Sequence, residues 1–161
     1  MRQNKFVCWC KHTIELAAAS SGLSGEEHMT AELLDRLRER LKVTEPKVTE
    51  AVERLIAAGS PQRVIAFGSR ARGDADADSD LDIAVVLDRV DPAKTADVGS
   101  WLLKGLYLDV DLLVTDQEHF EKFRRYQSSV HFDIDTEGVV LYDRARDAGP
   151  NRDAIAKISL R

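Results

Sequence analysis

Two aspartates stand one residue apart at the start of an apolar segment, with ten residues between them and a preceding Gly-Ser pair. They are Asp80 and Asp82, the apolar segment runs over residues 83–87, and the pair is Gly68-Ser69. In a β-strand, alternate side chains share one face, with about 6.6–6.8 Å between their Cα atoms. Carboxylates so placed can converge on two divalent cations about 3.5–4 Å apart, the separation that phosphoryl-transfer sites use. This strand therefore carries a candidate metal site.

The Gly-Ser pair offers groups of the complementary kind, which would bind a phosphate. It follows an apolar strand predicted over residues 63–67, and Gly68 allows the backbone to approach a phosphate closely. The Ser69 hydroxyl and the amides at a following helix start can donate hydrogen bonds to phosphate oxygens. Arg70 and Arg72 lie just past the turn, where either guanidinium could reach a triphosphate or remain at the surface without a ligand.

A third carboxylate is available on another predicted strand, which spans residues 108–114. Asp109 and Asp111 alternate onto one face of this strand, so the alternation alone does not choose between them. Alternate carboxylates beside an apolar run are costly to bury unless a cation compensates their charge. The pattern leaves simpler alternatives open: a solvated strand start for Asp80 and Asp82, and a charge at the strand edge for Asp111.

Taken together, these residues resemble a known motif. Gly68-Ser69, ten residues and Asp80-Leu81-Asp82 are similar to the signature of the DNA polymerase β-like nucleotidyltransferase superfamily, and the short arrangement resembles its minimal branch. The likeness continues at residues 110–114, where that family carries its third carboxylate, and at residues 137–142, which are similar to its closing strand. It covers roughly residues 64–143, about half of the chain.

The resemblance implies a set of site residues. Asp80, Asp82 and Asp111 would be the catalytic carboxylates and metal ligands, and the family pattern favours Asp111 over Asp109 as the third. Hard divalent ions accept carboxylate and phosphate oxygens together, so we expect Mg²⁺, as two ions, with Mn²⁺ as an alternative. The nucleotide-binding residues expected from the same motif are Gly68, Ser69, Arg70 and Arg72.

The resemblance also implies a reaction and a partner. Minimal nucleotidyltransferases of this size resemble antitoxins of two-gene bacterial systems, whose partners are HEPN-domain ribonuclease toxins. We therefore expect transfer of AMP from ATP to an acceptor hydroxyl, a tyrosine of such a toxin. About fifty residues follow the third predicted strand, too few for an acceptor-binding domain, so the acceptor is expected on another molecule. Two alternatives stay open: a non-catalytic module that neutralises its partner by occlusion, and a small-molecule adenylyltransferase acting as a dimer.

Composition narrows the class of protein. The 161 residues, 43% hydrophobic and 32% charged, suit one domain with a real core. The net charge of −5 argues against broad nucleic-acid binding, which depends on Lys and Arg. No apolar stretch approaches the ~20 residues that a membrane helix needs. The two cysteines, Cys8 and Cys10, are too close in sequence for a disulfide between them to stabilise a fold. We therefore expect a reducing compartment and a cytoplasmic protein.

The predicted fold class is α/β (α+β), a small mixed β-sheet with helices packed on it. Residues 1–28 are expected to be a poorly structured extension, residues 29–144 the nucleotidyltransferase domain, and residues 145–161 a C-terminal tail. Within the domain, apolar residues at helical spacing predict a helical lead-in over residues 30–59, and residues 63–143 form the core.

The core is expected to alternate strands and helices. Four strands are predicted over residues 63–67, 81–87, 108–114 and 139–142, with helices from Pro92 to Leu106 and after Asp116, which would cap its helix. Residues 127–136 stay open between irregular and helical structure. Ile155, Ile158 and Leu160 would suit a docking helix, but a frayed terminus is the more usual outcome and is favoured here.

Overall fold

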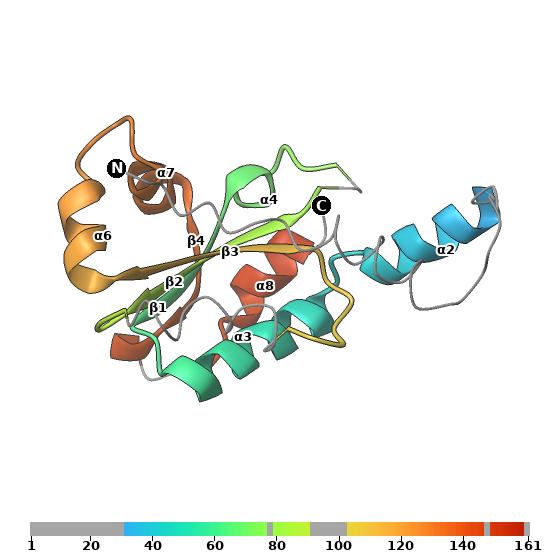
Figure 1. The fold of residues 1–161 in the computed structure, drawn as a ribbon, viewed down its shortest axis with the longest axis horizontal. Coiled ribbons are helices and arrows are strands. Elements are labelled where there is room, and N and C mark those ends of the chain that lie inside the picture. The colour runs from blue at the N-terminus through green and yellow to red at the C-terminus, as the bar shows by residue number, and fades with distance from the viewer. Residues whose placement is uncertain (1–30, 77–78, 91–102, 147–148, 160–161) are drawn as a thin grey trace, which may run out of the picture.

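The structure is a computed structural model that describes residues 31–76, 79–90, 103–146 and 149–159 (Figure 1). The extension expected over residues 1–28 and most of the helix expected over 92–106 lie outside the described residues.

Four strands form one mixed sheet. They are β1 (Arg63–Phe67), β2 (Leu81–Leu87), β3 (Val110–Asp116) and β4 (Val139–Asp143), in the order β3-β2-β1-β4. β1 pairs antiparallel with β2 and β4, whereas β2 pairs parallel with β3. The small mixed sheet predicted from the sequence is confirmed, and so are the bounds of β1 and β2. β3 begins at Val110, two residues later than predicted.

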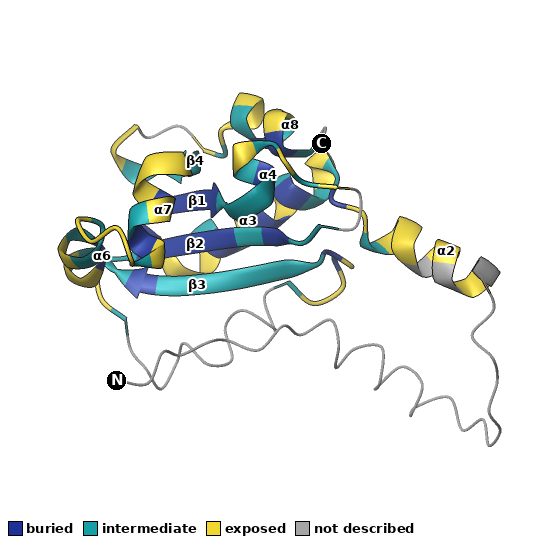
Figure 2. Cartoon of the chain, turned by 90° about the horizontal axis from the view of Figure 1, so that it is seen from above, coloured by how far each residue is buried: buried dark blue, intermediate teal, exposed yellow. Residues whose placement is uncertain are grey.

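Helices cover both faces of this sheet (Figures 1 and 2). α3 (Glu45–Gly59) and α8 (Arg152–Ser159) pack on one face, and α6 (Gln117–Phe123) and α7 (Val130–Glu137) pack on the other. α2 (Ala31–Leu41) extends away from the sheet in both views, and a single 3₁₀ turn at Arg144–Arg146 follows β4. None of the described helices combines the length and apolar character needed to cross a membrane.

The alternation of side chains along β2 divides the core into two layers. Leu81, Ile83 and Val85 are buried with α3 and α8, whereas Ala84 and Val86 are buried with Phe120 of α6 and Ile134 of α7. The central strands are accordingly the most buried part of the sheet (Figure 2). By the same alternation, Asp82 faces the layer of Ala84 and Val86.

Short polar residues define the helix ends. The Asp116 carboxylate accepts a hydrogen bond from the backbone N–H of His119 at 2.7 Å, so the predicted cap of α6 is confirmed. α3 ends at Gly59, the last residue of the predicted helical lead-in, and Ser60 after it takes the left-handed conformation with φ of 43°. Residues 127–136, for which the sequence left irregular and helical structure open, are helical from Val130 onward. The Ser129 hydroxyl caps this helix by accepting a hydrogen bond from the N–H of His131.

The C-terminal segment corrects the sequence interpretation. Residues 152–159 form α8, in which Ile155 and Ile158 are 0% and 1% exposed and belong to the same core layer as α3. Asn151 attaches the start of this helix to β4, since its N–H donates to the carbonyl of Leu141 at 2.7 Å. The favoured frayed terminus is therefore wrong for this stretch, and the docking helix is correct.

Candidate functional site

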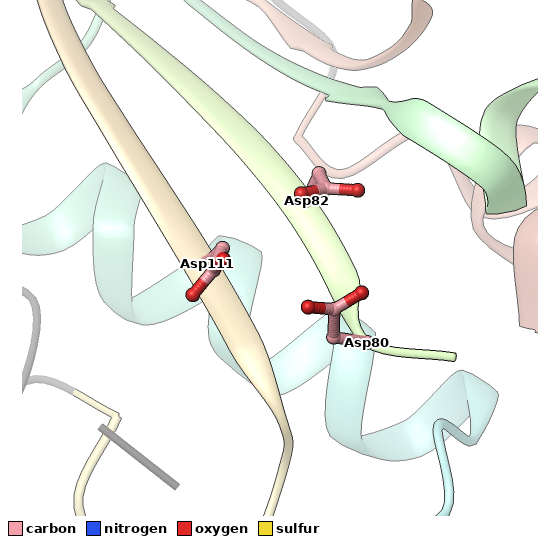
Figure 3. A group of neighbouring side chains, drawn as sticks. All are labelled: Asp80, Asp82 and Asp111. Atoms are coloured by element: carbon pink, nitrogen blue, oxygen red, sulfur yellow. The ribbon is translucent and has the colours of Figure 1, made fainter. Parts of the chain in front are cut away.

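Three carboxylates from two separate segments of the chain converge at one end of the sheet. Asp80, Asp82 and Asp111 each place one carboxylate oxygen within 4.8 Å of the others (Figure 3). Asp82 lies on β2 directly opposite Asp111 on β3, because the two strands run parallel in that register, and Asp80 precedes β2. The structure thus brings together the three carboxylates that the sequence motif selected.

Burial and like charge make this cluster electrostatically unfavourable without a cation. Burial, followed by the charges of Asp80 and Asp111, raises the pKa of Asp82 to about 6, and the charge of Arg72 opposes this rise. Burial also raises the pKa of Asp111, with smaller contributions from Asp80 and Asp109. Oxygen donors that repel one another in this way fit a hard divalent ion, whose charge would compensate theirs.

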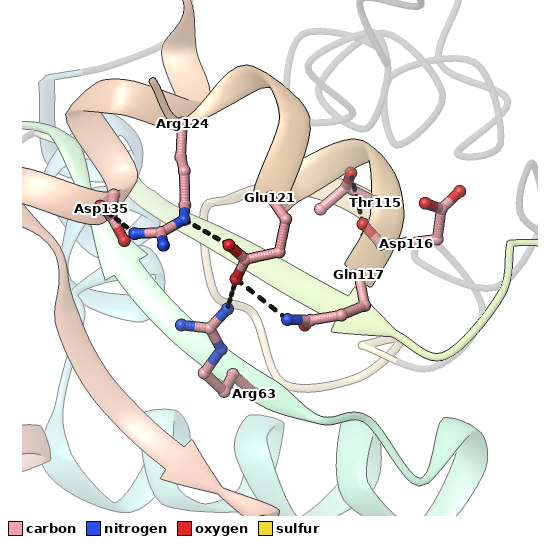
Figure 4. Close-up of polar contacts among 7 residues, drawn as sticks. All are labelled: Arg63, Thr115, Asp116, Gln117, Glu121, Arg124 and Asp135. Atoms are coloured by element: carbon pink, nitrogen blue, oxygen red, sulfur yellow. Dashed lines mark hydrogen bonds and ion pairs between the residues drawn. The ribbon is translucent and has the colours of Figure 1, made fainter. Parts of the chain in front are cut away.

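The acidic residues Glu121 on α6 and Asp135 on α7 are held quite differently from the aspartate cluster (Figure 4). There Arg124 bonds Glu121 at 2.6 Å and Asp135 at 2.9 Å, and Arg63 lies 3.8 Å from Glu121. These pairs tie the two helices to β1. Among the residues that the structure describes, no comparable ion pair reaches Asp80, Asp82 or Asp111. The three-aspartate cluster therefore differs from the ordinary paired carboxylates of this protein.

Gly68 is fitted against one of these carboxylates. It begins the short helix α4 (Gly68–Arg72) with φ of 71°, a left-handed conformation that favours glycine. A Cβ on Gly68 would overlap Oδ2 of Asp82 and lie 2.9 Å from its Cγ. Phe67, just before it, pairs with Asp82 across β1 and β2. The turn expected to approach a phosphate thus packs directly against the Asp82 carboxylate of the cluster.

Ser69 and Arg72 lie along the same short helix. The carbonyl of Ser69 accepts from the N–H groups of Gly73 and Asp74 at 2.8 and 3.1 Å, which closes α4. Arg72 is partly exposed and forms ion pairs with Asp74 at 3.3 Å and with Glu137 of α7 at 3.5 Å. The sequence offered no signal for the contact with Glu137, because the two residues meet only through the packing of α4 against α7.

Arg70 points elsewhere. Its side chain is buried, with 3% of the residue exposed, and its guanidinium donates to the backbone carbonyls of Ser79 and Asp80. The two arginines that the sequence treated alike therefore have different surroundings: Arg72 lies at the rim of the carboxylate cluster, and Arg70 lies beneath the loop that leads into β2.

The structure also separates the two candidates for the third carboxylate. Asp111 belongs to the converging group, whereas Asp109 does not. Asp109 contributes its backbone instead, since its carbonyl accepts from the N–H of Leu81 at 2.9 Å. The geometry therefore agrees with the family pattern that favoured Asp111.

Three converging carboxylates beside a Gly-Ser turn are the arrangement that the resemblance to nucleotidyltransferases led us to expect. The family of nucleotidyltransferase domains matches residues 45–135, which is more than half of the chain. The chain therefore belongs to this family. No curated protein sequence matches it.

Two solved structures are similar to the chain. One is a Sulfolobus solfataricus protein provisionally assigned as a nucleotidyltransferase, with 21% identity over 76% of this chain and 96% of its own, at a TM-score of 0.47. The other is a toxin–antitoxin with AMP-PNP, with 26% identity over 72% of this chain and 85% of its own, at a TM-score of 0.43. Both scores are below 0.5, so the family assignment rests on the domain match.

Proposed function

We propose that this nucleotidyltransferase transfers AMP from ATP to a hydroxyl group of a partner protein. The observation that supports a transfer reaction is the convergence of Asp80, Asp82 and Asp111 beside Gly68. Three carboxylates in this arrangement suit two divalent cations and the triphosphate that the cations would neutralise. Mg²⁺ is the expected ion, and Mn²⁺ would fit the same oxygen donors.

The residues would share the work of one displacement. Asp80 and Asp82 would hold the divalent cations that the triphosphate needs, while Ser69 and Arg72 would contact its outer phosphates from α4. Asp111 orients the acceptor hydroxyl and accepts its proton. The acceptor oxygen then forms a bond to the α-phosphorus, the bond from that phosphorus to the bridging oxygen breaks, and pyrophosphate leaves. When bound, the cations neutralise charge on the phosphates and lower the pKa of the acceptor hydroxyl. The protein contributes position and charge compensation.

The acceptor in this proposal is a tyrosine of a HEPN-domain toxin, and the chain would act as its antitoxin. What supports this part is the resemblance of the Gly-Ser and Asp-Leu-Asp motif to minimal nucleotidyltransferases. The acceptor hydroxyl would reach the Asp111 side of the cluster from a separate molecule.

Labelled ATP tests the reaction. The full chain is incubated with Mg²⁺, the product of the neighbouring gene, and ATP carrying ³²P on either the α- or the γ-phosphate. AMP transfer labels the partner from α-labelled ATP alone, and the Asp82→Asn protein serves as the inactive control. Label from the γ-phosphate would indicate phosphoryl transfer instead. Stoichiometric binding without label would favour occlusion, and label on an added small alcohol would favour a small-molecule acceptor.

A further inference from the structure

The three carboxylates are not held in the same way. Asp82 and Asp111 lie within paired strands, where the ladder between β2 and β3 fixes their backbones. Asp80 lies outside this ladder, because β2 begins only at Leu81. A ligand that follows a loop needs another device to hold it at the position that a metal site requires.

That device is a set of hydrogen bonds to the peptide groups on either side of Asp80. The carbonyl of Asp80 accepts from Nε of Arg70 at 3.2 Å, and the next N–H, that of Leu81, donates to the carbonyl of Asp109 at 2.9 Å. The carbonyl of Ser79 accepts from Nε and Nη2 of Arg70 at 3.1 and 2.6 Å. Both peptide planes that flank the Asp80 side chain are therefore bonded, and Arg70 bonds each of them.

Arg70 is well suited to this task. The planar guanidinium presents its donors in a fixed fork, so two adjacent carbonyls can be bonded at once, which a lysine ammonium does not reproduce. The side chain is 3% exposed, and burying a charged group of this size is costly unless its hydrogen bonds are made. α4 thus contacts Asp82 through Gly68 at its first residue and the backbone of Asp80 through Arg70 two residues later.

We propose that Arg70 is a positioning residue of the metal site, which holds the Asp80 carboxylate in place through the backbone, and that it is not a ligand of the nucleotide phosphates. This inference rests on the proposed function, since it takes Asp80, Asp82 and Asp111 as the ligands of a divalent cation.

The charge of Arg70 makes the proposal easy to test, because two explanations give opposite signs. The positive charge of Arg70 lies close to Asp80 and repels an incoming metal ion. If charge were its only effect, removing Arg70 would therefore strengthen metal binding. If Arg70 is a positioning residue, its removal weakens metal binding instead. Partners that orient metal ligands typically contribute about 10–100-fold in metal affinity when they are mutated.

The experiment measures Mn²⁺ binding to the full chain without nucleotide, with free Mn²⁺ read by electron paramagnetic resonance. Arg70→Gln is expected to bind Mn²⁺ at least about tenfold more weakly than the parent. Arg72→Gln is the matched control: it removes the same charge two residues away on the same helix, and its Mn²⁺ affinity is expected to hold or increase. Arg70→Lys keeps the charge but loses the fork, so a smaller loss is expected, and it decides the matter where Arg70→Gln does not fold by circular dichroism.

Unchanged or tighter Mn²⁺ binding by folded Arg70→Gln or Arg70→Lys would overturn the positioning role. Such a result with a weakened affinity for ATP would make Arg70 a phosphate ligand. Asp82→Asn separates this failure from that of the proposed function: when it abolishes Mn²⁺ binding, the metal site stands whatever Arg70 does. Mn²⁺ binding that survives Asp82→Asn would overturn both proposals.

Discussion

The backbone of Gly68 lies so close to the carboxylate of Asp82 that no side chain fits between them. A Cβ there would overlap one carboxylate oxygen, and the φ of 71° already excludes most other residues. The glycine of the Gly-Ser pair is therefore required by a protein contact as well as by any phosphate. The Gly-Ser turn and the strand that carries Asp82 are therefore in direct contact.

Replacing this glycine should damage the metal site beyond its effect on folding. Gly68→Ala is expected to cost about 1–2 kcal/mol of backbone strain. It should also displace the Asp82 carboxylate and weaken Mn²⁺ binding by at least about tenfold. Thermal unfolding and Mn²⁺ titration measure the two effects separately.

Gly105→Ala is the matched control for that experiment. Gly105 also has a left-handed backbone, with φ of 87°, but its Cβ would meet nothing within 4 Å. The control should lose similar stability and keep Mn²⁺ affinity. Equal losses of Mn²⁺ affinity in both variants would mean that the contact with Asp82 does not shape the site.

Asp82→Asn should abolish transfer and stabilise the fold at neutral pH. The folded state holds Asp82 with a pKa of about 6 against an ordinary value of 3.8, so the ionised carboxylate opposes folding. This penalty is absent below pH 3.8, grows as the pH rises, and is complete above pH 6. Allowing for solvent screening of a half-buried group, it amounts to about 1 kcal/mol.

The check is thermal unfolding of both proteins in excess chelator across the pH range. At pH 8 the variant should unfold about 2–4 °C above the parent, and the difference should disappear near pH 4. A variant that is less stable than the parent at pH 8 would contradict the electrostatic account. Near-normal transfer by the Asp82→Asn variant, or by Asp80→Asn, would contradict the assignment of these carboxylates to catalysis.

How far the sequence predicts this site depends on how local the determinants are. The alternation expected for an extended segment places Asp80, just before β2, and Asp82 on one side, and β1 and β2 appear where the apolar runs predict them. The approach of Asp111 to Asp82 needs the parallel register of β2 and β3, which no local pattern encodes. Here the family resemblance supplied what periodicity could not.

The roles of Arg70 and Arg72 show the limit most clearly. Read as part of a loop, the two are equivalent. Within the helix α4, a step of two residues is a rotation of about 200° around the helix axis. The two side chains therefore point to nearly opposite sides, so Arg70 is buried and Arg72 reaches the surface. The wrong prediction of a frayed terminus at α8 has a similar cause. Two isoleucines three residues apart are a weak indication of a buried helix, and the surface that buries them is formed by α3 and β4, which lie outside this segment of the sequence.

Nucleotide binding should depend strongly on a divalent cation. At a separation of about 4 Å, two like charges repel by roughly 4 kcal/mol at an effective dielectric of about 20. A triphosphate that approaches three clustered carboxylates meets several such repulsions, and Arg72, itself paired with Asp74 and Glu137, does not offset them. Calorimetric titration with ATP should show binding in Mg²⁺ and little in excess chelator. Equal affinity under both conditions would refute the metal site.

Asp111 separates an enzyme from an occluding module. If Asp111 orients the acceptor hydroxyl, Asp111→Asn should leave binding of magnesium and ATP largely intact, because Asp80 and Asp82 still hold the nucleotide's metal. Transfer should nevertheless fall by a factor of hundreds or more, since positioning and charge stabilisation are lost together.

The decisive comparison pairs transfer in vitro with neutralisation of the partner in cells for this one substitution. An enzyme that neutralises by modification loses both together. An occluding module depends only on its surface, and exchanging one carboxylate for an amide of the same shape on β3 leaves that surface nearly unchanged. Full neutralisation by an Asp111→Asn protein that transfers nothing would therefore replace the proposed reaction with occlusion, whereas loss of both would tie neutralisation to the chemistry of the three carboxylates.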